Sequence, residues 1–142
     1  MVGLDSCFLI DLYWEDSPRH AAVLKKFNEI AASGQDVCVY YNCFNEFIHV
    51  ITDKKRFENA FSMEEALSVV DEWRDLENVK ILFPDEQSFG RTVAWLSVYK
   101  LGRNRLNDTN MAASYVHSGV SSVITANPKD FEIFSELKII GY

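Results

Sequence analysis

The sequence predicts an α/β protein, a three-layer α/β/α sandwich around a mostly parallel central sheet of four or five strands. Short continuous apolar runs, typical of strands covered on both faces, recur along the whole chain. Amphipathic segments of about 10–20 residues separate them, long enough to serve as crossover helices. The 142 residues contain no repeat, low-complexity tract or linker. We therefore expect a single domain over residues 1–142.

Five apolar runs are the candidate strands. The second run, Val-Cys-Val-Tyr-Tyr, is the most strand-like, and Pro84 ends the third. The expected strands are residues 1–4, 37–41, 79–83, 121–125 and, as a short last strand, 138–140.

Helix-start signals precede most of the segments between the strands. Ser17 with Pro18, Asn42 and Asn107 are expected to cap helices, and Ser62-Met63-Glu64-Glu65 predicts a capping box. The helical segment after Asp85 is expected to turn Phe89, Val93 and Leu96 inward. The expected helices are residues 8–13, 18–33, 42 to about 53, 62 to about 76, 85 to about 99 and 107 to about 118.

Composition excludes several classes of protein. A net charge of −7 argues against a protein that coats nucleic acid non-specifically. No apolar run approaches the roughly 18 residues that cross a bilayer, so no membrane role is expected. The start lacks the basic leader of a signal peptide. The three cysteines lack a CxxC motif and predict neither a disulfide framework nor a zinc site, which fits the cytoplasm.

The basic residues are unevenly placed. Residues 1–86 hold 17 of the 21 acids, whereas residues 87–107 hold Arg91, Lys100, Arg103 and Arg105 and no acid. This basic stretch is either a site that recruits an anion or simply a solvated helix face followed by a polar loop.

Polar side chains follow the expected strands where each strand ends. Asp5 closes the first run, Glu46 lies one helical turn past the second, and Thr125-Ala126-Asn127 closes the fourth. Asp108 opens the helix that leads back to the fourth strand. The carboxyl ends of parallel strands meet at one edge of a sheet, where ligands bind. We therefore expect Asp5, Glu46, Asp108 and Asn127 to lie near one another.

Converging carboxylates repel one another unless a cation lies among them. Oxygen-only ligands favour a hard divalent ion, Mg²⁺ or Mn²⁺, which suits metal-assisted phosphodiester hydrolysis. Each residue also has an ordinary reading: Asp5 as a helix cap, Glu46 and Asp108 as solvated helix acids, and Asn127 as part of a turn.

Four motifs in this order resemble the PIN domain, in particular the VapC-type toxins of prokaryotic toxin–antitoxin pairs. The resemblance spans essentially the whole chain. Its motifs are Leu4-Asp5-Ser6, Asn45-Glu46-Phe47, Asn107-Asp108-Thr109-Asn110-Met111-Ala112-Ala113 and Thr125-Ala126-Asn127-Pro128-Lys129-Asp130-Phe131.

The resemblance implies a Mg²⁺- or Mn²⁺-dependent endoribonuclease, inhibited by a partner antitoxin and forming a homodimer. Asp5, Glu46 and Asp108 fall on the catalytic and metal-binding acids. Ser6 falls on a small hydroxyl position. Asn127 falls on a fourth metal-site position that is often Asp, and either Asn127 or Asp130 would support a second ion.

Other residues follow from the same resemblance. Cys7 stands where Asn or Ser is common, a departure that argues against a polar role there. Arg103 and Arg105 would bind phosphates flanking the cleaved bond of an RNA substrate, a tRNA or an rRNA, or else serve only solubility. The antitoxin is expected to occupy an apolar groove near segment 44–61, which includes Phe57.

Three other readings compete with this one. A haloacid-dehalogenase-type phosphatase needs a second Asp two residues after the first, where this chain has Cys7. A catalytically silent PIN fold would serve as a nucleic-acid-binding or protein-binding module. A third possibility is a PIN protein that regulates DNA together with a partner.

Overall fold

A five-stranded, fully parallel sheet forms the centre of the computed structural model, which describes residues 1–142. The strands lie in the order β3-β2-β1-β4-β5. This arrangement confirms the predicted fold class and all five expected strands. Their bounds are β1 Val2–Leu4, β2 Val37–Tyr40, β3 Val79–Leu82, β4 Ser122–Ile124 and β5 Lys138–Ile140.

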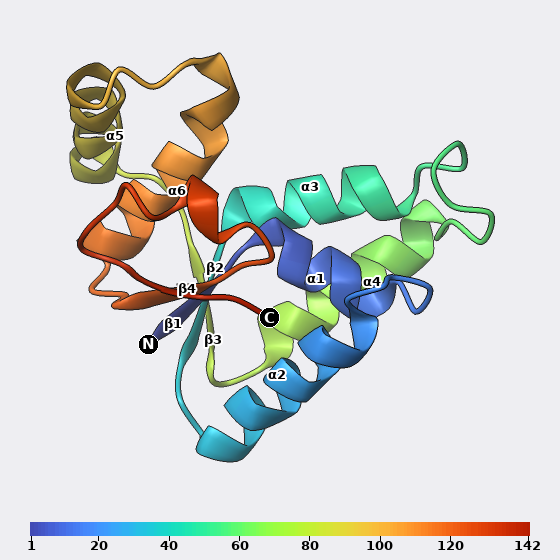
Figure 1. The fold of residues 1–142 in the computed structure, drawn as a ribbon. Coiled ribbons are helices and arrows are strands. Elements are labelled where there is room, and N and C mark those ends of the chain that lie inside the picture. The colour runs from blue at the N-terminus through green and yellow to red at the C-terminus, as the bar shows by residue number, and fades with distance from the viewer.

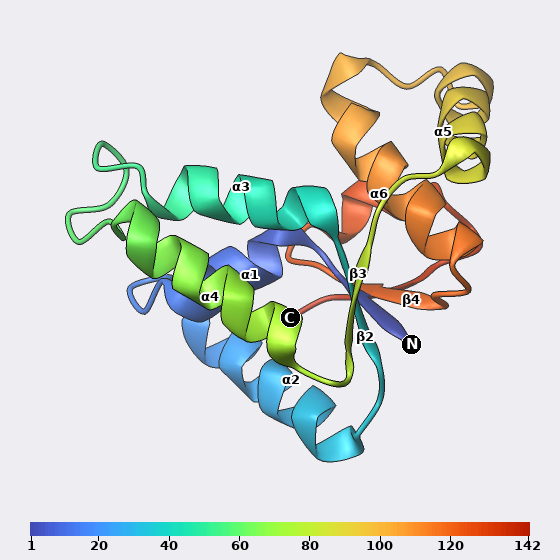
Figure 2. The same cartoon turned by 180° about the vertical axis from the view of Figure 1, so that it is seen from behind.

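Helices cover both faces of the sheet (Figures 1 and 2). The first four helices lie together on one face, and the last two pack against each other on the opposite face. Two short 3-10 helices, Arg103–Arg105 and Pro128–Asp130, lie in the connections before α6 and after β4. The α-helices are α1 Ser6–Tyr13, α2 His20–Ser33, α3 Tyr41–Ile51, α4 Met63–Asp75, α5 Glu86–Val98 and α6 Leu106–His117.

The direction of the connections reverses at β1. The first two crossovers place β2 and then β3 on one side of β1, whereas the third places β4 on its other side. Leu4 pairs with Val39 of β2 and with Ile124 of β4, so the three strands end at the same level. In a parallel sheet such a reversal opens a crevice beyond the carboxyl ends of the strands.

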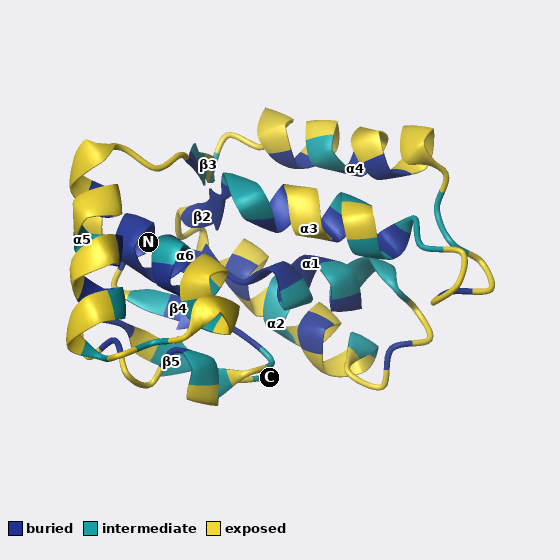
Figure 3. Ribbon diagram, turned by 90° about the horizontal axis from the view of Figure 1, so that it is seen from above, coloured by how far each residue is buried: buried dark blue, intermediate teal, exposed yellow.

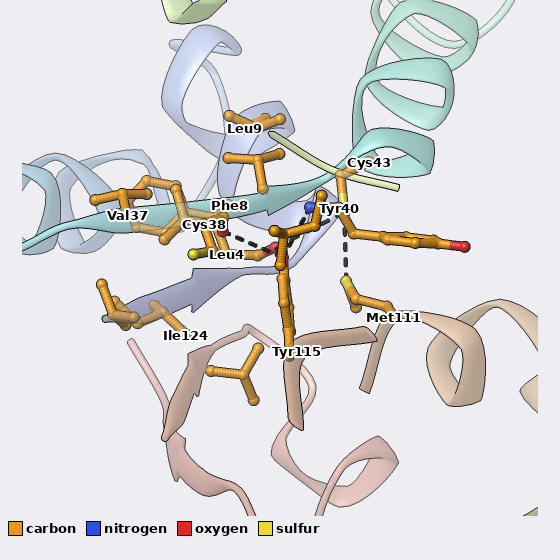
Figure 4. Close-up of a cluster of buried hydrophobic side chains, with 14 of the residues drawn as sticks. Leu4, Phe8, Leu9, Val37, Cys38, Tyr40, Cys43, Met111, Tyr115 and Ile124 are labelled. Carbon is orange, nitrogen blue, oxygen red and sulfur yellow. Dashed lines mark hydrogen bonds between the residues drawn. The ribbon is translucent and has the colours of Figure 1, made fainter. Parts of the chain in front are cut away.

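The core fills the spaces between the sheet and both helix layers (Figure 3). Tyr115 of α6 lies fully buried across β1 (Figure 4). Its hydroxyl donates to Leu4 O at 2.5 Å and accepts from the backbone N–H of Tyr40 at 3.1 Å. A Cβ atom at position 3 would lie 2.6 Å from Cε2 of this ring, so the close approach of α6 requires Gly3.

Several predicted helix caps are wrong. Only Ser62 forms its predicted capping box, with Glu65. The predicted helices at Asn42 and Asn107 begin one residue earlier than their expected caps, at Tyr41 and Leu106. Ser17 is not the N-cap of α2, which begins at His20 after Arg19; its hydroxyl donates to the buried Asp11 at 2.6 Å and accepts from the backbone N–H of Arg19 at 3.2 Å. Asp11, Ser17 and Arg19 form a tertiary cluster that no local signal indicates.

The inward face predicted for α5 is also wrong. Phe89 and Val93 are exposed, at 57% and 52%, whereas Thr92 and Trp95 are buried. Trp95 stacks on Phe134 at 4.8 Å between ring centroids, which fixes the rotation of the helix.

No helix in the structure combines the length and apolarity that crossing a bilayer requires.

Candidate active site

A small cleft lies at the carboxyl edge of the sheet, where β1, α3 and α6 meet. Asp5 follows β1, Glu46 lies in the second turn of α3, and Asp108 lies in the first turn of α6. All three carboxylates line this one cleft, as does Ser6. The remaining lining residues are Tyr40, Asn42, Cys43, Asn107 and Met111.

Asp5 occupies the N-cap position of α1, but its side chain makes no capping bond. Its Oδ2 instead accepts hydrogen bonds from Thr125 Oγ1 at 2.7 Å and from Cys7 Sγ at 3.0 Å. Its Oδ1 accepts a longer one from Ser6 Oγ at 3.3 Å. The ordinary reading of Asp5 as a helix cap is therefore wrong.

Glu46 and Asp108 differ in their surroundings. Glu46 is exposed on α3, whereas the Asp108 side chain is only 29% exposed. Burial, followed by the nearby charges of Asp5 and Asp130, raises the pKa of Asp108 to about 6, against the opposing effect of Arg105. Burial is the larger cause, and repulsion from the neighbouring acids adds to it.

Arg105 is already engaged by carboxylates. Its Nε lies 3.3 Å from Asp108 Oδ2, and its Nη1 lies 3.6 Å from Asp130 Oδ1. Its Nη2 also donates to the backbone carbonyl of Asp130. The buried Nε makes no hydrogen bond, so Asp108 satisfies it only electrostatically.

Three predicted site residues, Asn127, Arg103 and Arg105, lie outside the lining of the cleft. Asn127 is exposed, and its backbone N–H donates to Thr125 Oγ1 at 2.9 Å. Arg103 is exposed in the 3-10 helix that precedes α6. The structure thus brings together Asp5, Ser6, Glu46 and Asp108, with Arg105 beside them.

Sequence reasoning missed Thr125 and Cys7. Burial, and then the charge of Asp5, raises the pKa of the Cys7 thiol to about 12, so it stays protonated near pH 7 and donates to Asp5. The expectation that this position has no polar role is therefore wrong. Thr125 belongs to the motif at the end of the fourth strand, but the motif predicted a role for the side chain of Asn127, two residues later.

The donor set suits a hard divalent ion by chemical type, because three carboxylates line the cleft. No group of three or more His, Cys, Asp and Glu side chains is close enough, as placed, to hold a metal ion together. The residues thus fit such an ion in type and location, without a preformed coordination sphere.

The whole chain superposes on solved toxin–antitoxin structures. A chain of VapBC-1 from nontypeable Haemophilus influenzae matches with a TM-score of 0.70 and 19% identity, over 99% of this chain and 98% of that one. A chain of Rickettsia felis VapBC2, bound to a promoter DNA fragment, matches at 0.67 and 15%, over 100% and 99%. Mycobacterium tuberculosis VapC20, a sarcin–ricin loop cleaving toxin, matches at 0.64 and 14%, over 87% of each chain.

This chain has a PIN-like fold. No family model matches the sequence, and no curated protein matches it. The likeness is therefore one of fold, at identities of 14–19% for these three structures.

Proposed function

We propose that this protein is a Mg²⁺- or Mn²⁺-dependent endoribonuclease, the toxin of a type II toxin–antitoxin pair. One observation carries the proposal: Asp5, Glu46 and Asp108, far apart in the sequence, line one cleft at the strand-order reversal of a PIN-like fold. This is where open parallel sheets bind ligands. The same three residues match the acidic positions of the resemblance.

Asp5, Glu46 and Asp108 would hold the ion, with Asn127 supporting a second ion or a water at the rim. A hard cation there would make a water molecule more acidic and neutralise charge on the scissile phosphate. Arg105 balances part of the acidic charge beside the cleft, and Arg103 is exposed for contact with a flanking phosphate. Ser6 lines the cleft with its Oγ 3.3 Å from Asp5 Oδ1, and its hydroxyl would be available to a bound substrate.

The substrate we propose is a cellular RNA, a tRNA or an rRNA, cut at an unpaired segment. Tyr40 lines the cleft and contacts Tyr41 edge to face, and Tyr41 stacks on Phe83 at 5.5 Å with 19° between the rings. Phe83 is 68% exposed. Tyr40 is itself buried and Tyr41 half-buried, so Phe83 is the ring of this row that is free to stack on an unpaired base, which single-stranded RNA offers. Such an RNA substrate and the free cysteines are consistent with the cytoplasm.

The direct test is RNA cleavage by the purified protein with Mg²⁺ or Mn²⁺. Asp5→Asn and Asp108→Asn should each lower the cleavage rate by at least about 100-fold, because each removes a ligand charge from the cleft. They should also abolish growth arrest in cells that express the chain. Asp71→Asn is the matched control, since Asp71 is an exposed acid on α4. Cleavage by both cleft variants at the wild-type rate would refute the proposal.

The alternative is a catalytically silent PIN-fold module that binds nucleic acid or acts with a partner. The Arg105–Asp108 pair and the lack of a preformed metal group are the observations that favour it. Calorimetric titration with Mn²⁺ separates the two. Saturable binding that Asp108→Asn removes supports the nuclease, whereas no binding together with an RNA gel shift supports the silent module.

A hollow of about 300 Å³ fits the predicted antitoxin surface. It lies between the end of α1 and the loop after α3, within reach of segment 44–61. Its lining mixes apolar residues with the exposed acids Glu15 and Asp16, which suits a peptide with apolar and basic side chains. The lining residues are Tyr13, Trp14, Glu15, Asp16, Ile51, Phe57, Asn59 and Phe61. Solved neighbours of the same fold are toxin–antitoxin complexes, some of them bound to DNA.

We also propose that this protein forms a homodimer. Phe89 and Val93 lie one turn apart on α5 and form an exposed apolar strip, as a subunit interface would. Light scattering should report a dimer for the wild type and a monomer for Phe89→Ser. A monomeric wild type would contradict this part of the proposal.

A further inference from the structure

Two donors fix the carboxylate of Asp5, and both engage the same oxygen. Thr125 Oγ1 lies 2.7 Å from Asp5 Oδ2, and Cys7 Sγ lies 3.0 Å from it. Oδ1 keeps only the longer contact from Ser6. Two donors on one oxygen set the orientation of the carboxylate and leave the other oxygen less engaged.

Each donor is itself oriented by a backbone N–H group. The N–H of Asn127 donates to Thr125 Oγ1 at 2.9 Å, and the N–H of Ala126 donates to Cys7 Sγ at 3.2 Å. Each heteroatom accepts one of these bonds and donates its own hydrogen to Asp5 Oδ2, and Cys7 Sγ also lies 3.7 Å from Thr125 Oγ1. Two chains of hydrogen bonds therefore run from the consecutive N–H groups of Ala126 and Asn127 to one carboxylate. One passes through the Cys7 thiol and the other through the Thr125 hydroxyl.

These two chains of hydrogen bonds join the ends of two neighbouring strands. Asp5 follows β1 and Thr125 follows β4, and the backbone N–H of Asp5 donates to Ile124 O at 3.0 Å. Thr125 is fully buried and Asp5 is 8% exposed, so little water competes for these bonds. Hydrogen bonds to an ionised carboxylate in such surroundings are among the stronger ones in proteins.

We propose that Thr125 and Cys7 are positioning residues that hold the Asp5 carboxylate in a fixed orientation toward a divalent cation in the cleft. This inference rests on the proposed function. Partners that orient a metal ligand typically contribute about 10–100-fold to metal affinity. Neither residue touches the substrate or the ion, and both act through Asp5.

The test is calorimetric titration of Mn²⁺ into the purified full chain. Thr125→Val and Cys7→Ala remove the donors and should weaken Mn²⁺ binding by about tenfold or more each. Thr125→Ser and Cys7→Ser keep a donor and an acceptor and should restore an affinity close to that of the wild type. A role in packing alone would not produce this rescue by the hydroxyl.

The chain offers matched controls for both substitutions. Thr92→Val removes an equally buried hydroxyl that bonds only to Ser88 O, and Cys38→Ala removes a buried thiol of β2. Both should bind Mn²⁺ as the wild type does. Cys7 is only partly buried, so Cys7→Ala and Cys7→Ser keep the comparison available if Thr125→Val does not fold.

The possible results separate cleanly. Equal Mn²⁺ affinity of Thr125→Val, Cys7→Ala and the wild type would overturn the positioning role and leave the proposed nuclease intact. A wild type that neither binds Mn²⁺ nor cleaves RNA would overturn the proposed function, and this inference with it. Loss of affinity in the donor-free variants, with rescue in the serine variants, would support the inference.

Discussion

Asp108 lies among three other carboxylates, those of Asp5, Asp130 and Glu46, with Arg105 as the cation beside it. Its pKa of about 6 in the folded protein lies above its ordinary value of 3.8. The folded state therefore binds more protons than the unfolded state between about pH 4 and 6. This group's contribution to stability is full below about pH 4 and is lost as the pH rises through about 6.

This raised pKa predicts how Asp108→Asn changes stability in the absence of metal. At pH 7 with EDTA, the variant should unfold at a higher urea concentration than the wild type. Its free energy of unfolding should be larger by on the order of 1–2 kcal/mol. At pH 4 the two proteins should be nearly equal, because Asp108 is then mostly protonated in the wild type. Urea denaturation at both pH values measures the difference. Equal stabilities at pH 7 would show that the acids do not repel one another.

Single residues also show where sequence reasoning about the site succeeds and fails. Asp5, Glu46 and Asp108 were found because each follows a strand or opens a helix at a recognisable place in the chain. Their shared cleft follows from parallel topology, which the strand–helix alternation predicts. The Cys7 thiol could not be assigned, because its partner Ala126 lies at the far end of the chain and is fixed only by the pairing of β1 with β4.

Among the elements, strands were more predictable than helix ends. The central strands β1 and β2 are short apolar runs, and their burial on both faces leaves no choice of which face turns inward. A local cap signal does not by itself place a helix start: Ser17 lies in a cluster with the buried Asp11, and α2 begins only at His20. The rotation of α5 depends on where Trp95 meets Phe134, a contact that periodicity within the helix does not encode.

The packing of α6 on β1 predicts a severe effect of one methyl group. Gly3→Ala would place its Cβ 2.6 Å from the Tyr115 ring, which is held by hydrogen bonds at its hydroxyl. Because the ring cannot yield, the substitution should lower the free energy of unfolding by about 1–3 kcal/mol. Urea or thermal denaturation measures it.

Gly90→Ala is the matched control for this substitution. Gly90 lies within α5 and a Cβ there meets no atom within 4 Å, so alanine should leave stability unchanged or raise it by up to about 1 kcal/mol. If Gly3→Ala is as stable as the wild type, the contact between α6 and β1 is looser than the structure shows.

At the scale of the whole molecule, charge decides which partners are favourable. The net charge is −7, and the acids include Glu15 and Asp16, which line the hollow between α1 and the loop after α3. An RNA would be repelled by most of this surface, so productive contact is confined to the cleft and the basic residues near it. A basic protein partner would instead be attracted to the acidic surface and oriented at the hollow.

Charge reversal at the rim of the hollow tests this partner surface. Asp16→Lys should weaken the complex with the cognate antitoxin, sought as the product of a small adjacent gene, by about tenfold or more, mainly through slower association. Asp16 is exposed, so the fold and RNA cleavage should be unaffected. Surface plasmon resonance at two salt concentrations gives the association rate, which should depend less on salt in the variant.

The control for this reversal changes the net charge equally at another place. Glu132→Lys reverses an exposed acid in the segment between β4 and β5, which does not line the hollow. If both variants lose affinity to the same degree, only the total charge matters and the hollow is not the docking site. If Asp16→Lys alone loses affinity, the partner lies over the end of α1 and the loop after α3, and its basic side chains face Glu15 and Asp16.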